Sequence, residues 1–189
     1  RRFEQAEDCY RQALDLKLEF GDRHSAASTY HQLGMVAQDQ RRFEQAEDCY
    51  RQALDLSLEF GDRHSTASTY HQLGTVAQAQ RRFEQAEDYL RQALQAYRDS
   101  DDERAASQVT TTLGRVLADT GRYAEAFSIL VEATIGWWRL TGEFESEDIR
   151  SLTEQRTHLD QHTIDGVIDA LDPTTATALR HRLDQHDQT

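Results

Sequence analysis

Residues 41–80 read RRFEQAEDCYRQALDLSLEFGDRHSTASTYHQLGTVAQAQ, and residues 1–40 have the same residue at 36 of 40 positions. The four differences are Lys17/Ser57, Ala26/Thr66, Met35/Thr75 and Asp39/Ala79. Residues 81–120 match the second copy at 16 of 40 positions, and residues 121–160 retain little beyond the segment around Gly121. A fixed period of this length indicates a repeat architecture, in which each unit buries its apolar face against the next unit.

Apolar residues within each copy recur at helical spacing. From Phe43 onward they fall at i, i+3, i+7, i+10 and i+11, which is one stripe of a helix and not the alternation of a strand. We expect that helix to end near Phe60, with Gly61 as its terminating residue. Asp62 or Ser65 should cap the next helix. With one proline and nine glycines in 189 residues, the chain is predicted to be all-α.

The next helix contains a glycine in its middle. Its apolar face comprises Ala67, Tyr70, Leu73, Gly74 and Ala77. A glycine inside a helix costs about 1 kcal/mol relative to alanine, so we expect a neighbouring helix to approach closely at Gly74. Leucine at this position would then overpack the contact. Ala46, Tyr50 and Leu73 should be buried at the same helix–helix contacts.

These residues resemble the tetratricopeptide repeat family. Its pattern is aromatic-x2-Leu-Gly-x2-small, then Ala-x3-aromatic-x2-Ala in the second helix. Tyr30, Leu33, Gly34, Ala37, Ala46, Tyr50 and Ala53 fill it once. Tyr70, Leu73, Gly74, Ala77, Ala86, Leu90 and Ala93 fill it again, with Leu90 in place of the aromatic residue. Leu113, Gly114, Leu117, Ala126, Leu130 and Ala133 form a weaker third set.

The resemblance covers roughly residues 1–140, with two departures from the family pattern. The period is 40 residues rather than the usual ~34, and Leu58 stands in place of the final proline. Both departures indicate a longer second helix, as in the extended repeats of many bacterial multidomain proteins. The implied fold is a right-handed α-solenoid of helix-turn-helix repeats with a C-terminal helical cap.

In this arrangement the solenoid covers residues 1–160, as copies 1–40, 41–80 and 81–120 and a degenerate copy 121–160. The sequence begins on the second helix of a pair. Phe3, Ala6 and Tyr10 would therefore lie exposed, or be covered by another chain or by preceding sequence of a parent protein.

Residues 161–189 are expected to form the capping helices, interrupted at Pro173. Just before this region, Trp137 and Trp138 should either pack under the cap or form a patch for a partner.

Charge and composition exclude several function classes. The formal charge is −13, from 34 acidic and 21 basic side chains, which argues against nucleic-acid binding and against an anionic membrane surface. The sequence shows no transmembrane run and no leader segment, and its only methionine is Met35, which suggests a fragment or a trimmed product. Cys9 and Cys49 are expected to lie too far apart for a disulfide, which favours a reducing, cytoplasmic location.

The resemblance also implies that the first helix of each pair lines a concave groove. The residues predicted to face this groove are Ser28, His31, Met35, Gln38, Ser68, His71, Thr75, Gln78, Gln108, Thr111, Arg115 and Ala118. This surface is polar and nearly uncharged. It lacks the Lys and Asn with which some family members grip a peptide's C-terminal carboxylate. Two interpretations remain: a groove for a peptide or protein, or a solvated helix face without a ligand.

No catalytic constellation stands out in the sequence, and we expect no enzymatic activity, no cofactor and no metal. The repeated histidines are copies one helix-packing distance apart, about 8–10 Å, whereas ligands must converge within ~2.3 Å of one ion. Two function hypotheses follow. The first is a protein-interaction region of a larger intracellular signalling, regulatory or defence protein, which binds a partner or a neighbouring domain. The second is a structural repeat that self-associates through its N-terminal face.

Overall fold

The computed structural model describes residues 2–186, which form ten helices with no strand between them. Arg1, with which the predicted first copy opens, and residues 187–189 of the predicted cap lie outside the described residues. The helices are α1 (Arg2–Glu19), α2 (Arg23–Asp39), α3 (Phe43–Glu59), α4 (Arg63–Ala79), α5 (Phe83–Asp99), α6 (Glu103–Asp119), α7 (Tyr123–Thr141), α8 (Ser146–Arg156), α9 (Gln161–Ile168) and α10 (Pro173–His186). The all-α prediction is confirmed over the part of the chain that is described.

The helix boundaries follow from local capping chemistry. Asp62 accepts a hydrogen bond from the backbone N–H of Ser65 at 3.0 Å and so caps α4, as predicted. Gly61, which separates α3 from α4, has a φ of 66°, a left-handed conformation that glycine adopts without steric cost. The same conformation also occurs at Arg41 and Arg81, with φ of 58° and 60°. Neither position carries a glycine, so the sequence pattern did not predict a left-handed conformation at these two turns.

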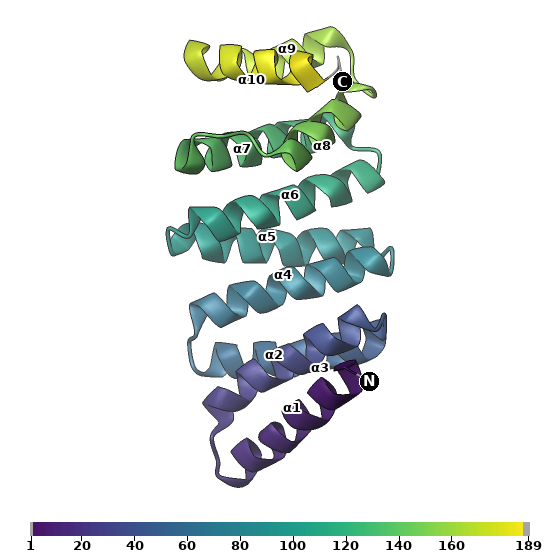
Figure 1. Cartoon of the computed structure of the whole chain (residues 1–189), viewed down its shortest axis with the longest axis vertical. Coiled ribbons are helices and arrows are strands. Elements are labelled where there is room, and N and C mark those ends of the chain that lie inside the picture. The colour runs from purple at the N-terminus through teal and green to yellow at the C-terminus, as the bar shows by residue number, and fades with distance from the viewer. Residues whose placement is uncertain (1, 187–189) are drawn as a thin grey trace. The chain divides into compact units, whose positions relative to one another are not determined.

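Helices α1 to α5 belong to a compact unit with the bounds Arg1–Ser100. Within it, α2 packs along α3 and α4 packs along α5, and α3 packs against α4 (Figure 1). Tyr50 is fully buried against α2, where a Cβ on Gly34 would lie only 2.6 Å from its ring. Gly74 and Leu90 repeat this contact one copy later, at 2.7 Å. The predicted burial of Ala46, Tyr50, Leu73 and Gly74 is confirmed.

The exposed stripe predicted on α1 is only partly present. Phe3 is 48% exposed, but Ala6 and Tyr10 are half-buried. Tyr10 packs against a cluster that includes Leu14 and Leu33, because α2 folds back along α1. The prediction was wrong for Tyr10, whose ring lies against α2.

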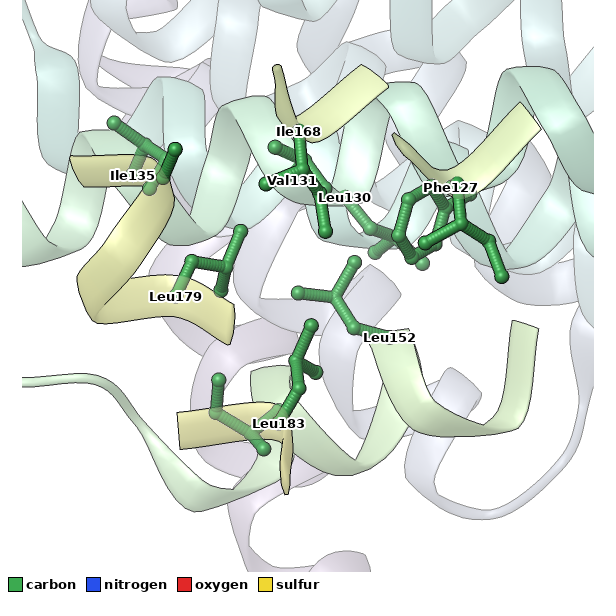
Figure 2. Close-up of a cluster of buried hydrophobic side chains, with 11 residues drawn as sticks. Phe127, Leu130, Val131, Ile135, Leu152, Ile168, Leu179 and Leu183 are labelled. Atoms are coloured by element: carbon green, nitrogen blue, oxygen red, sulfur yellow. The ribbon is translucent and has the colours of Figure 1, made fainter. Parts of the chain in front are cut away.

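Helices α6 to α10 belong to a second compact unit with the bounds Asp101–Thr189. Side chains from α7, α8, α9 and α10 converge in one apolar cluster (Figure 2). The figure labels Phe127, Leu130, Val131, Ile135, Leu152, Ile168, Leu179 and Leu183 in this cluster. Pro173 begins α10, where its missing N–H costs nothing. The predicted boundary at residue 160 falls inside this unit and stays a prediction.

The two adjacent tryptophans are both half-buried in the second unit. Trp138 stacks on Phe144, with ring centroids 5.5 Å apart. The guanidinium of Arg104 lies over the Trp137 ring at 5.7 Å from its centroid. Each indole therefore has a packing partner within its own unit.

Candidate functional site

A cavity of about 110 Å³ lies in the first unit, where α2, α3 and α4 meet, and most of its exposed lining surface is apolar. Its lining consists of Ala27, Ser28, His31, Gln32, Ala53, His64, Ser65, Ser68 and Thr69. One wall comes from α2 of one copy and the opposite wall from α4 of the next copy. The cavity therefore forms only where two copies pack together, because each copy supplies part of its lining.

The polar wall of the cavity is built on Thr69, which is 1% exposed. Its hydroxyl donates to the carbonyl of Ser65 at 2.7 Å. The same oxygen lies 3.2 Å from His31 Nδ1. Because the single hydroxyl proton is directed to Ser65, Thr69 Oγ1 accepts from His31, and this hydrogen bond places the imidazole proton on Nδ1.

His31 is held in one orientation by its neighbours. Its ring meets the Tyr50 ring edge-on, with centroids 5.3 Å apart. Burial lowers the pKa of His31 below the usual 6.5, because a low-dielectric site disfavours the imidazolium. The ring is therefore neutral at pH 7, and the cavity carries no positive charge from it.

The start of α4 is fixed by Asp62. Its carboxylate accepts from the backbone N–H of Ser65 at 3.0 Å and from the Ser65 hydroxyl at 2.7 Å. These two hydrogen bonds hold the pKa of Asp62 below its usual value. They also orient Ser65, so that the capping interaction shapes the cavity wall.

An ion-pair network that the sequence analysis missed holds successive copies in register. Glu47 of α3 binds Arg82 at 2.6 Å and Arg51 at 2.5 Å. One copy earlier, Glu7 binds Arg42 at 2.5 Å. The sequence signal is an acid at the seventh position of one copy and an arginine at the second position of the next. The hydrogen bond from Arg82 is the main reason why the pKa of Glu47 is lowered.

Three of the predicted groove residues line the cavity: Ser28, His31 and Ser68. Others bond within the protein. Gln38 accepts a hydrogen bond from the hydroxyl of Tyr50 at 2.8 Å, and the Thr75 hydroxyl donates to the carbonyl of His71 at 3.0 Å.

Met35 is 40% exposed and Gln78 is half-buried, and neither belongs to the cavity lining. In the second unit, the Thr111 hydroxyl donates to the carbonyl of Ser107, and Gln108 and Arg115 are exposed on α6.

Four polar residues of the lining escaped the sequence analysis: Gln32, His64, Ser65 and Thr69. The sequence pattern predicts a capping role for Ser65 and no role for the other three. Across residues 2–186, no three His, Cys, Asp or Glu side chains come together in a way that could hold a metal ion. The cavity offers hydroxyl, carbonyl and imidazole groups, which suit hydrogen bonding.

Comparison with protein families decides the assignment. The model of the tetratricopeptide repeat matches residues 1–59, 25–99 and 65–134. The chain belongs to the tetratricopeptide repeat family. Its fold is an all-α helical-repeat solenoid, as the sequence predicted.

Several solved structures share this tetratricopeptide repeat fold at low sequence identity. BtubC from P. vanneervenii is 22% identical, with a TM-score of 0.78 over 97% of this chain and 75% of that one. A Podospora anserina putative kinesin light chain with nearly identical TPR-like repeats is 15% identical, with a TM-score of 0.69 over 97% and 86%. YrrB, described as a TPR protein with an unusual peptide-binding site, is 20% identical, with a TM-score of 0.59 over 95% and 84%.

A search of curated proteins gave no match to this tetratricopeptide repeat chain. Among the described residues, no helix has the length and apolar character needed to cross a membrane.

Proposed function

We propose that this chain is a non-catalytic protein-interaction module, and that a segment of a partner or a neighbouring domain binds across α2 and α4 at the cavity. The single observation that supports it is the cavity itself, which presents side chains of two stacked copies to one ligand. Stacked repeats provide extended binding surfaces of this kind. The charge of −13 would attract basic partners and repel acidic ones.

The remaining predicted groove residues are proposed as partner contacts, each within its own unit. On α2 and α4 they are Met35, Gln38, His71, Thr75 and Gln78; on α6 they are Gln108, Thr111 and Arg115. Solved structures of the same fold include YrrB, with its peptide-binding site, and a Rap protein complexed with competence and sporulation factor, matched over 98% of this chain and 55% of that one at a TM-score of 0.66. We place the module in the cytoplasm, which the free thiols of Cys9 and Cys49 support.

The test is to block the cavity by a surface substitution. A partner is first captured by cross-linking and its contact segment is mapped and synthesised. Affinity is then measured by fluorescence anisotropy for Ser28→Tyr, which places a ring over the cavity from an exposed position. Gln52→Tyr, at an exposed position of α3 outside the cavity lining, is the matched control.

We expect Ser28→Tyr to weaken binding at least tenfold and Gln52→Tyr to leave it unchanged. The double variant His31→Ala with His71→Ala should also weaken it. Equal affinity of Ser28→Tyr and Gln52→Tyr would refute binding at the cavity.

Self-association is the second candidate function, and exposed apolar side chains on α1 favour it. Phe3 is 48% exposed and Leu16 is 55% exposed, while Phe20, just after the helix, is 80% exposed. Such side chains are a common feature of protein–protein contacts. Light scattering across a concentration series separates the two functions. A rising mass that Phe20→Ser abolishes would support self-association, and a constant monomer mass would exclude it.

A further inference from the structure

The first copy shows how this fold holds an ammonium group. Lys17 of α1 is half-buried, and its Nζ donates to the carbonyl of Ser25 at 3.0 Å and to the hydroxyl of Thr29 at 2.7 Å. Thr29 is 4% exposed. The lysine side chain thus runs from α1 into α2 and ends on two oxygen acceptors.

The second copy has the same acceptors without the lysine. Ser65 and Thr69 occupy the positions of Ser25 and Thr29, and both line the cavity. Ser57 stands where the first copy has Lys17. Its short side chain is 1% exposed and donates to the carbonyl of Leu54 at 3.0 Å, so it does not reach the acceptors. The exchange of lysine for serine leaves the carbonyl of Ser65 and the hydroxyl of Thr69 without a lysine ammonium from their own copy.

We propose that the cavity binds a lysine side chain of a partner protein, whose ammonium donates to the carbonyl of Ser65 and the hydroxyl of Thr69. The proposal rests on the proposed function and names the chemistry of its partner. The two copies are nearly identical in sequence, so the pair of acceptors that holds Lys17 in the first copy is reproduced in the second.

The acceptors have the capacity for this ligand. Thr69 Oγ1 has two lone pairs and His31 uses only one of them. Ser25, the equivalent of Ser65, accepts from Lys17 while it also accepts from the Ser28 hydroxyl. His31 is neutral at pH 7 and does not repel a cation.

The lining and the charge also favour a lysine side chain. Most of the surface that the lining exposes is apolar, which suits the alkyl part of the side chain. Ala27 and Ala53 give the cavity apolar wall segments against which the methylenes can lie. The net charge of −13 draws a cationic segment toward the protein.

The experiment is an NMR titration of the full chain at pH 7 with the peptide acetyl-Gly-Ser-Lys-Ser-Gly-amide. The norleucine peptide, which keeps the alkyl chain and lacks the ammonium, is the ligand control. We expect saturable shifts of the Ser65 and Thr69 amide signals with the lysine peptide and at least tenfold weaker binding of the norleucine peptide. Equal binding of the two peptides, or no shift with either, would overturn the proposal.

Substitutions at Ser57 provide the protein controls. Ser57→Lys places the chain's own ammonium on the Ser65 carbonyl and the Thr69 hydroxyl, as Lys17 does on their equivalents in the first copy. It should weaken the binding of the lysine peptide at least tenfold. Ser57→Ala adds no ammonium and should bind the lysine peptide like the original protein. Thr69→Val removes the hydroxyl acceptor and should also weaken binding of the lysine peptide at least tenfold. It gives an independent test if Ser57→Lys does not fold. Retained affinity in folded Ser57→Lys or Thr69→Val refutes the lysine site.

Failure of this inference can be told apart from failure of the proposed function. Suppose the captured partner segment is blocked by Ser28→Tyr but binds Ser57→Lys normally. The interaction module then stands and the lysine site falls. If instead Ser28→Tyr has no effect on the partner segment while the lysine peptide shifts Ser65 and Thr69, the cavity binds lysine but is not the partner surface.

Discussion

Alanine at position 74 should destabilise the protein, although alanine is the better helix former. In an open helical position this exchange gains about 1 kcal/mol. At Gly74 the new Cβ would lie 2.7 Å from Leu90 Cγ and 3.3 Å from the carbonyl oxygen of Ala86. Carbon atoms prefer a separation of about 3.5–4.0 Å, and Leu90 is fully buried. Overpacking of a core costs about 1–3 kcal/mol, so after the gain of about 1 kcal/mol we expect a net loss of up to about 2 kcal/mol.

The assay is thermal unfolding followed by far-ultraviolet circular dichroism. For a chain of this size, 1 kcal/mol shifts Tm by about 2–4 °C, so Gly74→Ala should lower Tm by up to about 8 °C. Gly136→Ala is the matched control, because Gly136 lies inside α7 and a Cβ there meets nothing within 4 Å. That variant should be neutral or stabilised by up to about 1 kcal/mol.

A double substitution tests the cause. Leu90→Ala alone should cost about 2–5 kcal/mol through the cavity it leaves. Combined with Gly74→Ala it should cost less than the sum of the two single effects, because the alanine methyl enters the vacated space. If Gly74→Ala is as stable as Gly136→Ala, or if the two changes are additive, then Gly74 is not in close contact with Leu90.

Three further predictions concern ionisation and the repeat itself. Burial, with Glu145 and Glu147 nearby, raises the pKa of Asp148 to about 6. Ionisation of Asp148 therefore opposes folding as the pH rises from about 4 to above 6. Asp148→Asn should stabilise the protein by about 1–3 kcal/mol at pH 7 and by almost nothing near pH 4, as measured by urea unfolding. The pKa of Glu47 is lowered, so its ionised form stabilises the fold above pH 4.5, and that contribution is lost as the pH falls through the lowered pKa. Glu47→Gln should cost about 1–2 kcal/mol of unfolding free energy at pH 7. If the cost measured by urea unfolding does not shrink on acidification, the ion pair does not stabilise the fold. Deletion of residues 41–80 should give a folded, shorter protein with an unchanged ellipticity per residue. The reason is that Gly34 would then face Leu90, which already packs on the equivalent Gly74. Loss of cooperative unfolding would show that the copies are not interchangeable.

The repeat, the helices and their caps could be predicted from sequence because they depend on local chemistry. The spacing of apolar residues from Phe43 to Leu54 selects a helix, Gly61 supplies the left-handed turn, and Asp62 caps the helix that follows. Gly74 predicted a close contact because a glycine inside a helix is unfavourable unless a neighbour requires it. Each of these signals lies within a few residues of the feature it predicts.

Tertiary structure alone decided which side chains meet between helices. A helical period identifies a buried face but does not set the relative position of two helices along their axes. For that reason the contact between Glu47 and Arg82, 35 residues apart, and the packing of Tyr10 on α2 were not predicted. Which groups bond to the serine and threonine acceptors also depends on side-chain length. In the sequence, the exchange of Lys17 for Ser57 is one substitution among four. Only the packing of α1 on α2 shows that Lys17 donates to the carbonyl of Ser25 and the hydroxyl of Thr29. The shorter Ser57 side chain bonds to the carbonyl of Leu54 within its own helix.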